Sequence, residues 1–212
     1  LNINGPMQSF IRNGIVKRTR VADRNNENGL HISGNTTKFA FSEFRSWMEF
    51  KPTGNLWFGN FFKLGEGIDF ANARLGDVFA FEPRARWNIN RHASLHLNYK
   101  YSTMEYMDRE VYTANLIDFR ISYQFSLRSF LRLSVVASDV HRNLDNYLDE
   151  NKDSYDEEFK SLSTQLLFSY KVNPQTLFFI GYSDGGYQND DIDSLKKNTR
   201  SVFMKMSYAW IM

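Results

Sequence analysis

The stretch SVFMKMSYAWIM, residues 201–212, indicates the fold class because two kinds of residue alternate along it. Every second position is large and apolar or aromatic: Val202, Met204, Met206, Tyr208, Trp210 and Met212. The positions between them are smaller and mixed in character. A period of two predicts a β-strand with one apolar face and one face that accepts polar side chains. The apolar face must be covered by lipid or by other protein, and the rest of the sequence indicates which of the two.

The same alternation recurs along most of the chain, whereas helical signals are poor. The clearest examples are residues 79–89, 93–102, 116–126, 130–138 and 162–171. Residues 38–51 alternate less regularly, residues 55–65 are readable as a strand, and residues 10–20 form a weak strand at best. We therefore expect an all-β, antiparallel fold with about ten strands. Residues 1–37 are expected to hold the weak first strand and a long loop, and residues 38–212 the remaining strands of one domain.

Composition narrows the class of protein. The chain of 212 residues has no cysteine, which excludes disulfides and thiolate chemistry, and its net charge of +2 does not favour nucleic acid as a partner. Aromatic residues make up 16% of the chain, and the mean hydropathy is −0.50. No run approaches the roughly 18 to 20 apolar residues that a membrane helix needs. Residues 1–10 do not resemble a signal peptide, so we expect a mature chain or the C-terminal part of a longer one.

The predicted connections alternate between short and long. Short turns are expected at residues 52–55, 88–92, 126–129 and 172–175. Long polar links are expected at four further places: residues 65–77, 103–112, 141–158 and 183–198. Tight turns on one side and long loops on the other are typical of transmembrane β-barrels, whose strands need about 9 to 11 residues to cross the bilayer. The closing stretch would then be a final strand that ends on the short-turn side, with its apolar face against lipid.

The alternative fold is a soluble sandwich, in which the apolar face packs against a second sheet. A charged face suits either a barrel lumen or a soluble surface. As lumen-lining residues we predict Glu82, Arg84, Arg86, His96, Lys100, Asp118, Arg120, Arg132 and Lys171. Aromatic residues with polar tips near strand ends favour a membrane interface. As interface residues we predict Tyr99, Tyr101, Tyr123, Tyr170, Tyr208 and Trp210.

Three stretches resemble a known family. LSTQLLFSYKVNPQTLFFIGYSD (162–184), SLRSFLRLSVVASDVHRN (126–143) and the closing twelve residues are similar to the C-terminal region of large outer-membrane proteins of Bacteroidota. Those proteins carry an N-terminal domain similar to family 9 carbohydrate-binding modules, followed by a membrane barrel of unassigned function. The resemblance implies that this chain is such a barrel or the C-terminal section of a larger one. It implies no catalytic motif, and the carbohydrate-binding-like module is not visible in the sequence.

Catalytic and metal-binding signals are weak. Asp139 and His141 at the outer end of a predicted strand are weak candidates for acid–base catalysis, and a chance meeting of residues in a polar loop is the favoured interpretation. The acidic loop offers Asp149, Asp153 and Asp156 as weak metal ligands, but no EF-hand spacing is present and a solvated loop is the favoured interpretation. We expect no cofactor.

These observations lead to one functional expectation and two alternatives. We expect an integral β-barrel of a Gram-negative outer membrane that acts as anchor, scaffold or pore of a larger cell-surface protein. Its expected partners are membrane lipid and other outer-membrane or surface lipoprotein subunits, and not nucleic acid. The first alternative is an outer-membrane hydrolase with its site near Asp139 and His141. The second is a soluble β-sheet binding protein.

Overall fold

A computed structural model describes the chain except residues 1–6, 18–21, 24–30, 33–37, 193 and 210–212. Ten strands form one antiparallel sheet in the order β1-β4-β5-β6-β7-β8-β9-β10-β11-β12. Their bounds are β1 Met7–Lys17, β4 Lys38–Thr53, β5 Leu56–Asp69, β6 Arg74–Asn88, β7 Ala93–Tyr106, β8 Arg109–Ser126, β9 Ser129–Arg142, β10 Glu158–Asn173, β11 Thr176–Gln188 and β12 Lys196–Tyr208. The prediction of an all-β antiparallel fold with about ten strands is confirmed.

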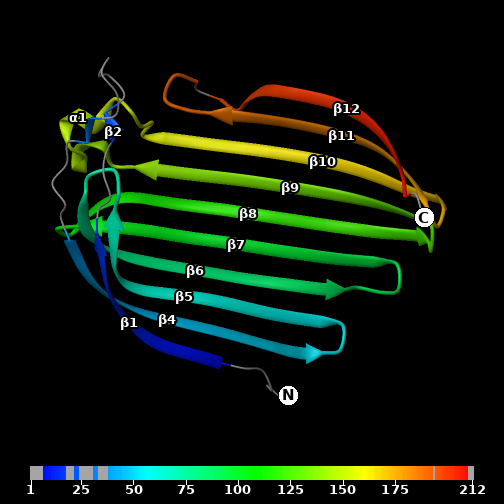
Figure 1. The fold of residues 1–212 in the computed structure, drawn as a ribbon, viewed down its shortest axis with the longest axis horizontal. Coiled ribbons are helices and arrows are strands. Elements are labelled where there is room, and N and C mark those ends of the chain that lie inside the picture. Colours follow the sequence, from blue (N-terminus) through cyan, green and yellow to red (C-terminus); the bar gives the residue numbers. More distant parts are fainter. Residues whose placement is uncertain (1–6, 18–21, 24–30, 33–37, 193, 210–212) are drawn as a thin grey trace.

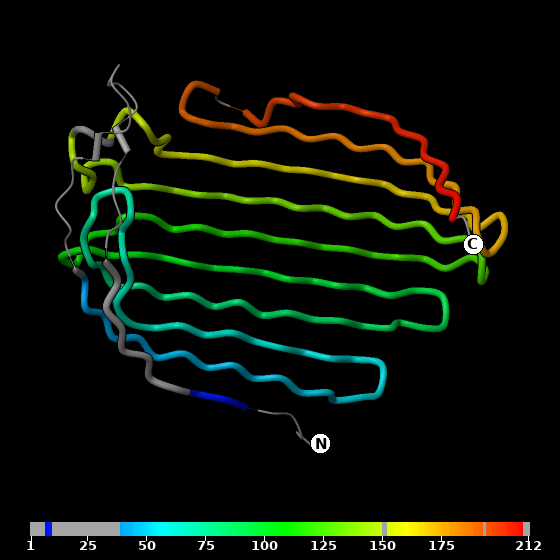
Figure 2. Tube along the Cα trace, in the orientation of Figure 1, coloured from blue at the N-terminus to red at the C-terminus, as the bar shows by residue number. Residues whose placement is uncertain are grey.

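The strands lie side by side in chain order, so the sheet is a meander (Figures 1 and 2). Two two-residue strands, β2 (Ala22–Asp23) and β3 (His31–Ile32), form a separate pair. The only helical turns of the described chain, η1 (Leu144–Asn146) and α1 (Asp149–Lys152), lie between β9 and β10. The weak first strand expected near residues 10–20 is β1, and it pairs with β4 at the edge of the main sheet.

The strand register separates the side chains into two faces. One row of directly paired residues crosses eight neighbouring strands, β5 to β12, and carries apolar or aromatic side chains throughout. Its members are Leu56, Trp87, Leu95, Ile121, Leu133, Leu166, Tyr182 and Val202. The adjacent row carries mainly polar side chains: Trp57, Arg86, His96, Arg120, Ser134, Gln165, Ser183 and Ser201. Because successive side chains point to opposite faces, one face of the sheet is apolar and the other polar.

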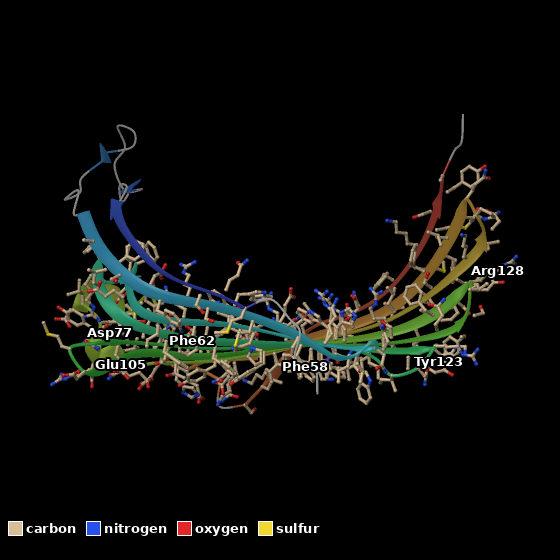
Figure 3. All side chains as sticks on the ribbon, turned by 90° about the horizontal axis from the view of Figure 1, so that it is seen from below. Phe58, Phe62, Asp77, Glu105, Tyr123 and Arg128 are labelled. Carbon is tan, nitrogen blue, oxygen red and sulfur yellow. The ribbon has the colours of Figure 1, made fainter. Side chains whose placement is uncertain are left out.

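The sheet is strongly curved but not closed. Seen edge-on, it forms an arc with nitrogen-bearing side chains gathered on the concave side and carbon-rich side chains beneath the convex side (Figure 3). Strands β1 and β12 are the two edges and do not pair with each other. The structure therefore shows an open curved sheet, and closure into the expected barrel stays a prediction.

The turns and loops correct part of the predicted alternation. The four short turns are confirmed at one end of the sheet, between β4 and β5, β6 and β7, β8 and β9, and β10 and β11. At the other end, the predicted long links at residues 65–77 and 103–112 are wrong. Strands β5 and β6 pair as far as Asp69 and Arg74, and Met107 and Asp108 alone connect β7 to β8. The polar residues of these two segments belong to the strands, because the backbone pairing between neighbouring strands continues beyond the apolar part of the sheet.

Few side chains are buried, because the described residues contain no second layer on the apolar face. The small apolar cluster contains Val78, Met104, Val111 and Tyr147. It lies at the loop end of the sheet, where the β9–β10 connection folds over the polar face. Leucine, phenylalanine and tyrosine side chains of the convex face are half-exposed or exposed instead.

Candidate functional site

All nine predicted lumen residues lie on the polar, concave face. Strand register places Arg86 opposite His96, His96 opposite Arg120, and Arg132 opposite Leu167. The other predicted positions have the same parity as these residues on their own strands. The sequence pattern therefore identified which residues share a face. Whether that face lines a lumen stays a prediction, because the sheet is open.

Charges near the loop end of this face are paired. The Glu43 side chain is only 2% exposed and contacts Arg45 at 2.6 Å and Lys63 at 2.9 Å. Glu82 contacts Arg84 at 3.2 Å and Lys100 at 3.1 Å. Each carboxylate bridges cations from its own strand and the next, which offsets the cost of placing charge in a crowded face. Sequence analysis missed Arg45 and Lys63, although each directly follows a phenylalanine in its strand.

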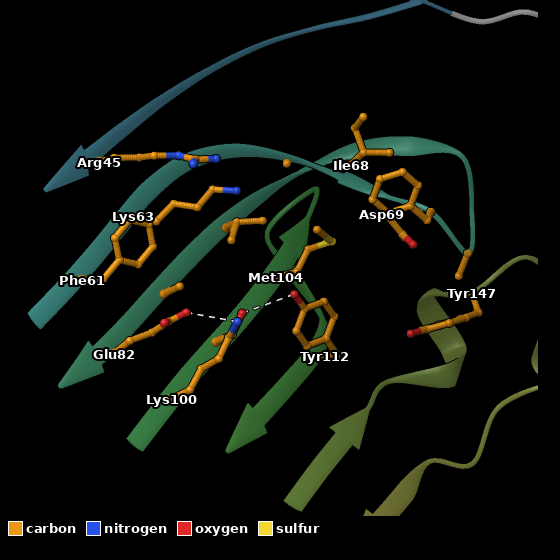
Figure 4. Close-up of a pocket in the computed structure, with 16 residues that line it drawn as sticks. Arg45, Phe61, Lys63, Ile68, Asp69, Glu82, Lys100, Met104, Tyr112 and Tyr147 are labelled. Atoms are coloured by element: carbon orange, nitrogen blue, oxygen red, sulfur yellow. Dashed lines mark hydrogen bonds and ion pairs between the residues drawn. The ribbon is translucent and has the colours of Figure 1, made fainter. Parts of the chain in front are cut away.

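A pocket of about 500 Å³ lies among these ion pairs and under the β9–β10 loop. Figure 4 shows the Lys100 ammonium reaching toward Glu82 on one wall, and Tyr147 of the loop on the other. The Tyr112 hydroxyl also lies 3.4 Å from the hydroxyl of Ser102. Because cations and carboxylates neutralise one another here, the pocket is polar without a strong excess of charge.

The β9–β10 loop is held by a network around the buried carboxylate of Asp69. Asp69 accepts hydrogen bonds from Asn72 Nδ2 at 2.7 Å and from Arg74 Nε at 3.0 Å. Arg74 also donates to the Asn146 carbonyl oxygen and lies 4.0 Å over the Tyr106 ring. Asn72 Oδ1 accepts the Leu148 backbone N–H at 2.9 Å. The network fastens this loop across the ends of β5 to β8.

Tyr147 belongs to the same loop, and its side chain is buried. Burial, reinforced by the nearby negative charge of Asp69, raises the pKa of the Tyr147 phenol above its usual value of 10.0. The neutral form is therefore the one that fits the docked loop.

A second pocket, of about 820 Å³, lies at the turn end of the concave face. Strands β7, β8 and β9 place His96, Arg120 and Arg132 in its wall, and the β6–β7 turn adds Arg91. This turn is ordered by Asn90 Oδ1, which accepts the backbone N–H of His92 at 2.8 Å and of Ala93 at 2.9 Å. The pocket therefore has a defined rim and a cationic wall.

Two further arginines of the concave face lie over aromatic rings. The Arg84 guanidinium lies 5.3 Å over the Trp47 ring and that of Arg86 lies 4.8 Å over the Trp57 ring. Trp57 Nε1 donates to Glu49 at 3.0 Å. Gly59 lies beside these rings, and a Cβ atom there would come within 2.5 Å of Trp57. Glycine at position 59 therefore leaves room for the Trp57 indole.

The convex face carries aromatic side chains at both borders of its apolar area. At the turn end, Tyr123 stacks on His92 with 6.1 Å between ring centroids and meets Phe125 edge-on at 5.0 Å. Tyr170 and Tyr208 also lie near this end. Toward the loop end, the Tyr99 hydroxyl donates to Asn115 at 2.6 Å, and Tyr101 lies two residues further along β7. The five described tyrosines predicted for a membrane interface share this face, whereas Trp210 lies outside the described residues.

Asp139 and His141 are close together, as sequence analysis anticipated. His141 Nε2 lies 3.1 Å from Asp139 and its Nδ1 lies 3.6 Å from Glu158. The register places the pair above the apolar area on the convex side, with Lys160 directly opposite Asp139. Among the described residues, both nitrogens of the ring face carboxylates and neither contacts a hydroxyl group. The geometry is an ion-pair cluster and not a nucleophile–base arrangement.

The acidic loop does not gather its carboxylates. Asp149 pairs with Lys152 at 3.1 Å, and Asp156 accepts a hydrogen bond from Asn189 at 3.4 Å. Among the residues that the structure describes, no group of three or more acidic or histidine side chains is placed to hold a metal ion, and Asp153 therefore belongs to no such group. Nor does any described helix have the length and apolar character needed to cross a membrane.

Comparisons with protein-family models, curated proteins and solved structures found no match. The resemblance of residues 162–184 and 126–143 to Bacteroidota outer-membrane proteins therefore stays a prediction.

Proposed function

We propose that the chain is an integral outer-membrane protein whose convex face contacts lipid and whose concave face lines a polar interior. The observation that carries this proposal is the pair of adjacent rows described above, one apolar and one polar across β5 to β12. A single sheet in water has no reason to expose a continuous apolar face, whereas a lipid-facing barrel wall requires one.

The dimensions of the apolar area support the proposal. On β8 it extends from Ile117 to Phe125, nine residues, or about 26 Å along the strand. At the usual barrel tilt of about 35 to 45°, this length spans about 18 to 21 Å of the bilayer, which is most of the apolar band of about 25 Å in outer-membrane barrels. The tyrosines lie at its borders, where rings with polar tips are favoured.

The edges of the sheet are compatible with closure. Strand β1 begins at the turn end and β12 ends there, so the two run antiparallel when brought together. An antiparallel wall therefore closes either by pairing β12 with β1 or through an even number of further strands. We propose that closure removes the open edges, which otherwise present unpaired backbone groups.

Within the membrane, the protein serves as anchor, scaffold or pore of a larger cell-surface protein. The docked β9–β10 loop narrows the loop end of the concave face, and the paired charges hold the interior polar. We propose lipid and partner subunits of the outer membrane as its contacts, with the short turns on the periplasmic side.

Tryptophan quenching tests this proposal. Trp87 belongs to the apolar row and is 42% exposed, whereas Trp57 belongs to the polar row. One variant keeps only Trp87 and its matched control keeps only Trp57, with the other tryptophans changed to phenylalanine. In vesicles that contain lipid brominated near the headgroup, we expect strong quenching of Trp87 and little quenching of Trp57. Equal quenching of both, or none of Trp87, would refute a lipid-facing convex side.

A further inference from the structure

We infer that the turn-end pocket of the concave face binds a small organic anion, a phosphate or a carboxylate. The pocket of about 820 Å³ contains three arginines, Arg91, Arg120 and Arg132, and no acidic side chain among its lining residues. This volume is within the range of pockets that enclose small molecules. The inference concerns the interior face and holds whether or not lipid covers the opposite face.

The guanidinium groups are available to a ligand. Arg132 Nε donates to Ser122 at 3.3 Å, and its terminal nitrogens have no partner among the described residues. Arg120 is fixed by one contact of 2.9 Å between its Nη2 and Asp118. Arginine presents several N–H donors in a planar fork, which matches the oxygens of phosphate and carboxylate groups.

The local charge balance differs from that of the neighbouring pocket. Near the loop end, Glu43 and Glu82 each contact two cations. At the turn end, Asp118 is the carboxylate that contacts one of the three arginines. Positive charge is therefore left uncompensated in a concave site, where it attracts anions more strongly than on a flat surface.

Uncharged groups of the same pocket suit the rest of an organic anion. Ser94, Ser122 and Gln124 add hydrogen-bonding groups, while Phe130 adds an apolar surface. The Arg132 guanidinium lies 5.2 Å over the Phe130 ring, which holds its plane in place. Preorganised cations beside a small apolar surface favour a compact solute over a bare, hydrated inorganic ion.

Titration calorimetry on the 212-residue chain in a neutral maltoside detergent tests the inference, with citrate as the organic probe and inorganic phosphate as the comparison, and we expect citrate to bind more tightly. We expect binding at low ionic strength that Arg132→Gln and Arg120→Gln each weaken by at least about tenfold. The matched control is Arg84→Gln, which removes the same charge from the same face outside the pocket. Because Arg84 lies over Trp47 and pairs with Glu82, we expect it to change the affinity less than about twofold.

Ser122→Asp keeps the test decisive even where an arginine variant fails to fold. A carboxylate beside Arg132 supplies the missing partner inside the pocket, so we expect anion binding to be lost while the fold is retained. Circular dichroism of each variant checks the fold. Absence of binding to the unaltered chain, or equal weakening by Arg84→Gln and Arg132→Gln, would overturn the inference. The detergent readout is independent of the lipid-quenching result, so the two proposals fail separately.

Discussion

A charge placed on the convex face distinguishes lipid from water as its surroundings. Leu166 lies on β10 between Leu133 and Tyr182 of the apolar row and is 41% exposed. The apolar face of β10 runs from Leu162 to Tyr170, so Leu166 is four residues, or about 13 Å, from either border. This position corresponds to the middle of the proposed membrane-spanning band.

We expect Leu166→Arg to destabilise the lipid-embedded protein by about 2 to 4 kcal/mol, the cost of arginine near the midplane on the lipid face of a barrel. This corresponds to a folding equilibrium lowered about 30-fold to 900-fold. The matched control is Gln165→Arg, the adjacent residue on the polar face, whose direct partners are Ser134 and Ser183. A surface substitution in a polar environment is expected to cost within about 0.5 kcal/mol.

Urea titration of each variant folded into phosphatidylcholine vesicles, followed by tryptophan fluorescence, measures the two free energies of unfolding. The difference between Leu166→Arg and Gln165→Arg is the informative quantity, because both add the same side chain to the same strand. Equal free energies for the two variants would contradict a lipid-covered convex face. A large loss for Leu166→Arg in lipid-free buffer, from a chain that is soluble there, would indicate a protein layer over this face instead.

Three further predictions concern packing and the loop, and a fourth concerns catalysis. Gly181→Val should lower the free energy of unfolding by about 1 to 3 kcal/mol in the same titration, because a Cβ atom would come within 2.3 Å of the Phe203 ring. Asp69→Asn should accelerate proteolysis in the β9–β10 loop, since loss of a partner from a buried ion pair with Arg74 costs about 3 kcal/mol. The raised pKa of Tyr147 means that its contribution is complete below pH 10 and is lost as the pH rises further, so loop cleavage should increase above pH 10. His141→Gln should leave any hydrolysis of phospholipid or peptide unchanged, because the ring faces two carboxylates; a loss of turnover would restore the catalytic interpretation.

The strands and their faces were predictable because side chains alternate with a period of two wherever the two faces meet different environments. Residues 93–102 and 116–126 lie within β7 and β8, and their apolar positions share one face. The charged residues of β6 to β10 were assigned to the opposite face for the same reason. The face on which a side chain lies can be predicted from the local sequence alone, because successive side chains of a pleated strand point to opposite faces.

The loop end could not be predicted in the same way. Residues 65–77 and 103–112 carry polar side chains on both faces, which resembles a loop in sequence although the backbone ladder continues through much of it. Met107 and Asp108 form a two-residue turn with φ angles of 52° and 58°, without the glycine that usually marks such a turn. The contact of Glu43 with Lys63 and the link from the Asp69 network to the β9–β10 loop also escaped prediction, because these partners come from another strand or loop.

The distribution of charge over the concave face has a functional consequence that the fold alone does not require. A polar interior could be filled by evenly paired charges, as the contacts of Glu43 and Glu82 show at the loop end. At the turn end, arginines outnumber their carboxylate partners in a pocket that lacks an acidic wall. Unpaired arginines in a crowded face destabilise one another, so their presence favours a ligand that compensates them. Once the proposed wall closes around this face, its cationic turn end would attract and retain anions near the short turns.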